Sequence, residues 1–172
     1  MPINIYNPPP SEWYLVEGDA YNWGVQVNTF GGVGYIYVSR VRVSAPFKAT
    51  QYRFYVDVQS GNYDVGLYTG SLGALSLFWS IGSTPVPTAG LTTPSISPSI
   101  TIPPGYYWTA FGCDNTTAKF SYSNITGGHL GPVFPRVNVT GIFPLPLTIS
   151  SSFTTTDRRY GPVFINGNAP TF

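Results

Sequence analysis

Apolar and polar side chains alternate along residues 51–58, and this period of two predicts a β-strand with one buried face. The polar face carries Arg53, Tyr55 and Asp57. The apolar face consists of Tyr52, Phe54, Val56 and Val58. A turn at residues 60–62 (SGN) and a second alternating run at residues 63–68 follow, so we expect the two runs to form an antiparallel hairpin.

Similar short runs rich in β-branched and aromatic residues recur along the whole chain, separated by Gly and Pro. No window of a dozen residues shows helical spacing free of Gly, Pro and β-branched residues. We therefore predict an all-β, antiparallel β-sandwich of about nine strands with essentially no helix. The remaining predicted strands cover residues 23–30, 35–43, 74–80, 106–113, 118–123, 147–153 and 163–166.

The stretch at residues 99–117 (SITIPPGYYWTAFGCDNTT) predicts a central strand of the sandwich. Pro103-Pro104-Gly105 is typical of a turn, because proline fixes φ and glycine accepts a positive φ. In the strand that follows, Tyr106, Trp108 and Ala110 share one face. The other face holds Tyr107, Thr109, Phe111 and Cys113. Both faces are apolar, so we expect one on the core and the other against a loop or a neighbouring subunit.

Two long segments lack clear alternation, residues 83–98 and residues 124–146, and both are expected to be loops. The second is expected to hold a short strand at 137–140. We expect residues 21–172 to form a single sandwich domain, preceded by an extended N-terminal arm at residues 1–20.

The arm is expected to be stiff, because three consecutive prolines favour an extended polyproline conformation. Two alternatives are equally open: the arm docks on a neighbouring chain, or it forms an edge strand of its own sandwich. The residues expected at an assembly interface are Ile3, Ile5, Tyr6, Pro8, Pro9, Pro10 and Trp13.

Composition narrows the possible partners. Charged residues make up 9% of the 172 residues, with a net charge of +1, whereas apolar residues make up 42%. So few charges favour a surface partly covered in an assembly. The Lys and Arg side chains are dispersed, which disfavours binding to nucleic acid. The N-terminus lacks the features of a secretory signal, and no apolar run approaches a membrane span, so we expect neither export nor membrane insertion.

Candidate catalytic and metal-binding residues are few. A Cys113–His129 dyad is formally possible, but a buried structural thiol and a loop histidine are the simpler interpretation. Asp57 and Asp64 flank the predicted hairpin turn and could form a carboxylate pair, although solvated carboxylates are the ordinary finding. Residues 114–117 (DNTT) are interpreted as a turn in which Asp114 or Asn115 bonds nearby backbone. We expect no cofactor and no metal.

Exposed aromatic rings could instead hold a sugar. The candidates for glycan contact are Trp13 and Trp23, together with Tyr55 and Tyr68 on the outer face of the predicted hairpin. The alternative is that these rings pave cross-strand pairs and subunit contacts.

Five stretches between about residues 50 and 165 carry a resemblance to a known group of proteins. They are residues 63–68 (YDVGLY), 99–108 (SITIPPGYYW), 114–117 (DNTT), 143–146 (FPLP) and 161–165 (GPVFI). Their order resembles a jelly-roll domain of tailed-bacteriophage virion proteins, found in head-decoration, tail and fibre components. The resemblance implies jelly-roll topology, a place in the virion after synthesis in the host cytoplasm, and a homo-oligomer, expected to be a trimer.

We therefore expect a non-enzymatic structural protein that docks on capsid or tail proteins through its arm and an apolar sheet face. The alternative is a carbohydrate-binding or host-receptor-binding module that uses exposed aromatic residues. A hydrolase is the third and least favoured hypothesis.

Overall fold

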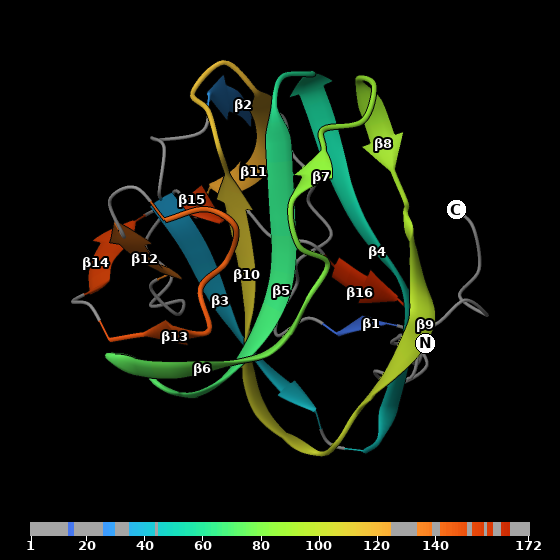
Figure 1. Cartoon of the computed structure of the whole chain (residues 1–172), viewed down its shortest axis with the longest axis vertical. Coiled ribbons are helices and arrows are strands. Elements are labelled where there is room, and N and C mark those ends of the chain that lie inside the picture. The colour runs from blue at the N-terminus through green and yellow to red at the C-terminus, as the bar shows by residue number, and fades with distance from the viewer. Residues whose placement is uncertain are drawn as a thin grey trace, which may run out of the picture.

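The computed structural model describes nine segments of the chain (Figure 1). They are residues 14–15, 26–29, 35–43, 45–124, 134–138, 142–150, 153–156, 158–159 and 163–165. Every regular element in them is a β-strand, and every strand pair is antiparallel. The strands form two eight-stranded sheets that pack face to face. The prediction of an all-β antiparallel sandwich without helix is thus confirmed for this part of the chain, whereas its jelly-roll topology stays a prediction.

The first sheet is built around the long strand β4, which pairs with β16, β11, β8 and β9. Its strands are β1 (Tyr14–Leu15), β2 (Gln26–Thr29), β4 (Phe47–Val58), β8 (Gly90–Thr92), β9 (Ser95–Ile102), β11 (Lys119–Asn124), β15 (Arg158–Arg159) and β16 (Val163–Ile165).

The second sheet has the order β13-β6-β5-β10-β3-β12-β14, with β7 paired to β5. Its strands are β3 (Tyr35–Val43), β5 (Asn62–Ser71), β6 (Ala74–Ser80), β7 (Thr84–Pro85), β10 (Gly105–Cys113), β12 (Phe134–Asn138), β13 (Thr148–Ile149) and β14 (Phe153–Thr156).

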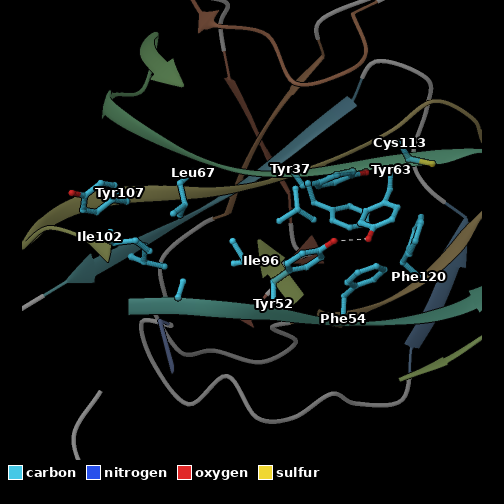
Figure 2. Packing of buried hydrophobic residues seen from close by; sticks show 14 of the residues in the cluster. Tyr37, Tyr52, Phe54, Tyr63, Leu67, Ile96, Ile102, Tyr107, Cys113 and Phe120 are labelled. Carbon is cyan, nitrogen blue, oxygen red and sulfur yellow. Dashed lines mark hydrogen bonds between the residues drawn. The ribbon is translucent and has the colours of Figure 1, made fainter. Parts of the chain in front are cut away.

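The core between the sheets is rich in aromatic rings. Figure 2 shows Tyr52 and Phe54 pointing from β4 toward Tyr63 of β5. The ring centroids of Phe54 and Tyr63 are 4.8 Å apart, as are those of Phe111 and Phe120. The hydroxyl groups of Tyr52 and Tyr63 meet at 2.6 Å, so each phenol finds a partner inside the core. Tilted ring pairs of this kind stabilise a core beyond the area they bury.

A second apolar cluster lies on the outer face of the second sheet. Its buried members are Ile36, Val38, Tyr68, Leu75, Trp108, Ala110, Leu145 and Ile149. Leu145 and Ile149 belong to residues 142–150. This segment crosses the outer face of the sheet and then enters β13 (Figure 1). Gly66 lets this segment approach closely, because a Cβ there would lie 2.7 Å from Leu145 Cδ1. As predicted, β10 is covered on both faces, here from Tyr107 to Cys113, and the outer cover is a segment of the same chain.

The predicted hairpin of residues 51–58 and 63–68 is wrong. β4 and β5 belong to different sheets, so the turn at residues 60–62 is an arch that crosses the core. The physical reason lies in β5, whose faces are both buried, from Tyr63 through Tyr68. Such a strand needs neighbours on both edges, and β5 finds them in β10 and β6.

The predicted loop at residues 83–98 is also wrong, because it contains β7, β8 and the start of β9. β8 and β9 pair with β4, and the register shifts between Ala49 and Gln51. Pro98 lies within β9, which within the described residues has a partner on one side only. Edge strands and bulges tolerate proline, so its presence does not exclude a strand.

Of the predicted arm, residues 14–15 form β1 and pair with β16. The rest of residues 1–20 lies outside the described residues, so the arm's boundary and docking stay predictions. The short strand expected at 137–140 lies at Phe134–Asn138.

Candidate functional site

The most prominent candidate for a binding surface is an exposed apolar pair on the outer face of the first sheet. Tyr55 is 37% exposed and Leu91 is 59% exposed. The two residues lie directly opposite each other in the β4–β8 ladder, so their side chains share one face. We call them the Tyr55–Leu91 pair.

Polar groups surround this pair. Arg53 Nε donates a hydrogen bond to Thr93 Oγ1 at 3.3 Å. This bond links β4 to the residue that directly follows β8. Asp57 is exposed on the same face of β4, two residues beyond Tyr55. An apolar centre bordered by polar side chains is the usual anatomy of a small contact surface.

Tyr68, the second tyrosine predicted to face solvent, is buried, and this prediction of its position is wrong. Its ring lies under residues 142–150 in the outer cluster, and its hydroxyl donates to the Pro146 carbonyl at 2.7 Å. Burial raises the pKa of this phenol. Tyr68 is therefore not available to stack on a sugar, and the structure does not bring it together with Tyr55.

The other candidates for interface or glycan contact lie outside the described residues. They are Ile3, Ile5, Tyr6, Pro8, Pro9, Pro10, Trp13 and Trp23. His129 also lies outside them, so the Cys113–His129 dyad is tested only at the thiol.

The Cys113 thiol is buried at the end of β10, within the aromatic core. Burial raises its pKa to about 11, so the thiolate is scarce at neutral pH. Asn115 Nδ2 lies 3.5 Å from the sulfur, as a weak hydrogen bond. The prediction that the Cys113 thiol is buried is confirmed.

Asp57 and Asp64 do not form a carboxylate pair. Asp57 is exposed on the first sheet, whereas Asp64 is fully buried on the second. Asp64 accepts hydrogen bonds from Ser80 Oγ at 2.8 Å and from the Leu145 N–H at 2.9 Å. Burial raises the pKa of Asp64, and these hydrogen bonds partly oppose the shift. This carboxyl ties residues 142–150 to the sheet and was not expected to be buried.

The turn after β10 fixes the arch between the sheets. Asp114 accepts hydrogen bonds from the Asn62 N–H at 2.8 Å and from Asn62 Nδ2 at 2.7 Å. Asn115 Oδ1 accepts the N–H groups of Thr117 and Ala118, as the sequence predicted for a self-bonded turn. Within the described residues, no group of three or more His, Cys, Asp and Glu side chains is placed to hold a metal ion.

One surface feature was missed by sequence reasoning. Arg40 and Arg42 of β3 lie beside the exposed ring of Tyr106 on β10. The sequence shows Arg40 and Arg42 as a pair on one strand face, and Tyr106 at a strand start. It does not show that β3 and β10 are neighbours, or in which register, and only that pairing brings the three together.

No family model matches this chain, and no curated protein matches it. In the part of the chain that is described, no helix has the length and apolar character needed to cross a bilayer.

Proposed function

We propose that this chain is a non-enzymatic structural protein of a phage virion, a decoration, head-fibre or tail component. It docks on capsid or tail proteins through its N-terminal arm and the outer face of the first sheet. The observation that carries the proposal is the Tyr55–Leu91 pair, two large apolar side chains left exposed side by side on that face. The placement in a phage particle, the jelly-roll topology and the trimer rest on the resemblance described above.

The choice of the first sheet follows from what covers the second. The outer apolar cluster of the second sheet is closed by Leu145 and Ile149 of the same chain. The first sheet carries the Tyr55–Leu91 pair on a chain with only 9% charged residues. A surface with few charges and an exposed apolar pair favours association.

The homo-oligomer part of the proposal is tested by the mass of the purified chain in sedimentation velocity across the micromolar range. We expect an oligomer, and we expect Tyr55→Ser with Leu91→Ser to shift it toward monomer by weakening association about tenfold or more. Leu72→Ser is the matched control, because Leu72 is 45% exposed in the turn between β5 and β6. A monomeric wild-type chain, or an equal effect of Leu72→Ser, would overturn self-association through this pair.

The arm is tested by deleting residues 1–12, which end before β1. We expect a folded domain that no longer assembles into particles. An unfolded truncated chain would place the segment in the core of its own sandwich instead, and would contradict the arm's proposed role.

A second candidate function, a carbohydrate-binding or host-receptor-binding module, is favoured by the exposure of the Tyr55 ring. An aromatic ring with one apolar body and a polar tip can stack on a sugar face. A glycan array discriminates the two: specific binding that is lost in Tyr55→Ala, with unchanged thermal unfolding, would favour this module over the structural role.

A further inference from the structure

Two arginines and a tyrosine form an exposed cluster on the outer face of the second sheet, beyond the cover of residues 142–150. Along β3, Val41 and Val43 are buried, whereas Arg40 and Arg42 are exposed. Tyr106 of β10 lies opposite Arg42 in the ladder and is 53% exposed. We call Arg40, Arg42 and Tyr106 the Arg–Tyr cluster.

The two guanidinium groups are held near one ring. The Arg40 Cζ atom lies 4.3 Å from the Tyr106 ring centroid, and the Arg42 Cζ atom lies 6.0 Å from it. The two positive charges are therefore at most about 10 Å apart, roughly the screening length in 0.1 M salt. Like charges at this separation repel, and an anion between them would relieve the repulsion.

The cluster has unused hydrogen-bonding capacity. Within the described residues, neither guanidinium makes a hydrogen bond or an ion pair, and their contact with Tyr106 is a cation–π contact. Guanidinium groups present N–H donors in a planar fork that matches a carboxylate. The neighbouring Trp108 is fixed, because its Nε1 donates to the Gly70 carbonyl at 3.1 Å.

We infer that the Arg–Tyr cluster binds a carboxylate-bearing saccharide. The guanidinium groups bind the carboxylate, and the part of the exposed Tyr106 ring that Arg40 does not cover contacts the apolar face of the sugar. Two cations are too few for the counterion release that drives binding to nucleic acid, so a short acidic glycan fits better than a long polyanion. This inference goes beyond the proposed structural role, because the cluster and the Tyr55–Leu91 pair lie on different sheets.

The test uses tetragalacturonic acid as the probe and the full chain, at low salt, followed by NMR at the Arg Nε–Hε and Tyr ring resonances. We expect saturable shifts at Arg40, Arg42 and Tyr106. Arg40→Gln with Arg42→Gln should lower the affinity about tenfold or more, because charge-assisted hydrogen bonds are lost. Both arginines are exposed, so the thermal unfolding midpoint should stay unchanged.

Three comparisons make the test decisive. Lys48→Gln removes the same charge from an exposed position on the first sheet, and should leave the affinity within about twofold. Maltotetraose, which has no carboxylate, and tetraglutamate, which has no sugar ring, should bind more weakly than the probe. An absence of shifts at the cluster, an equal loss in Lys48→Gln, or equal binding of either comparison ligand would overturn the inference. None of these results bears on the Tyr55–Leu91 pair, so failure here is distinct from failure of the proposed function.

Discussion

At the scale of single residues, two aspartates show that different surroundings shift the pKa of the same side chain in opposite directions. Asp64 is fully buried under residues 142–150, and burial raises its pKa. Asp114 is partly exposed; burial raises its pKa too, but hydrogen bonds from Asn115 and Asn62 outweigh this, and its pKa is lowered. The two carboxyls should therefore make opposite contributions to stability as pH changes.

For Asp64, stability should be lost as pH rises. A group with a raised folded pKa contributes its stability fully below the unfolded pKa of about 3.9, and loses it as pH climbs through the folded pKa. We expect the free energy of unfolding of the wild type, relative to Asp64→Asn, to fall as the pH rises above about 4. Chemical denaturation at several pH values measures it. A difference that rises with pH would mean that the hydrogen bonds outweigh burial.

For Asp114, the sign is reversed. A lowered folded pKa gives stability that is present above the unfolded pKa of about 3.9 and is lost as pH falls through the folded pKa. The free energy of unfolding of the wild type, relative to Asp114→Asn, should therefore decrease as the solution is acidified below about pH 4. The same denaturation series measures it, and a difference independent of pH in this range would contradict the assignment.

At the scale of elements, the arch between β4 and β5 decides how the two sheets are joined. Gly61 has a φ of 59°, and a Cβ there would clash with Asp114 Oδ1 and Asn115 Nδ2. Those side chains cannot move freely. Asp114 is held by Asn62, and Asn115 Nδ2 donates to the Ser60 carbonyl at 3.0 Å.

Gly61→Ala should therefore destabilise the fold by about 2 kcal/mol or more, from left-handed backbone strain together with the clash. Gly82→Ala is the matched control: its φ is 74°, but a Cβ there meets nothing within 4 Å. It should cost about 1 kcal/mol from strain alone. Equal losses in the two variants, measured by chemical denaturation, would show that the Asp114–Asn115 turn does not hold the arch.

The strands that the sequence predicted well are those that carry a run of apolar and β-branched residues bounded by Gly, Pro or a turn. The predicted ranges 35–43 and 74–80 coincide with β3 and β6, and 106–113 falls one residue short of β10. The alternation of apolar and polar residues indicates which face of a strand is buried, but not which strand is its neighbour. For this reason a hairpin was predicted where an arch joins β4 to β5. β8 and β9 were missed because edge strands need no apolar period and tolerate Pro98.

The candidate sites were also limited by the fact that a local pattern does not show which strands or segments are neighbours. The prediction that Tyr55 is exposed was correct, because buried and more exposed side chains alternate along this part of β4. Tyr68 occupies the matching position on β5, but residues 142–150 cover that face from far along the chain. The Arg–Tyr cluster likewise depends on the pairing of β3 with β10, which the local pattern does not specify.

At the scale of the whole molecule, the described chain has two sheets and a cover on the outer face of the second, formed by the residues of segment 142–150 that lead into β13. The cover is held by polar anchors as well as by apolar contact. Tyr68 donates to the Pro146 carbonyl, the Leu77 N–H donates to the Leu147 carbonyl at 2.8 Å, and Asp64 accepts the Leu145 N–H. This cover closes the outer apolar cluster of the second sheet, whereas the Tyr55–Leu91 pair on the first sheet stays exposed.

Two leucines in that cover provide a test of its importance, because they lie two residues apart in very different surroundings. Leu145 is 6% exposed and packs in the outer cluster, whereas Leu147 is 79% exposed. Leu145→Ala should lower the free energy of unfolding by about 2–4 kcal/mol, since it removes buried methyl groups and leaves a cavity above Gly66. Leu147→Ala should change it by less than about 0.5 kcal/mol.

Because loosening the cover would also uncover Trp108 and Tyr68, the Leu145 variant should bind a hydrophobic dye such as ANS more strongly than the Leu147 variant. Equal stability of the two variants would mean that residues 142–150 rest on the sheet without stabilising it, which would contradict this prediction.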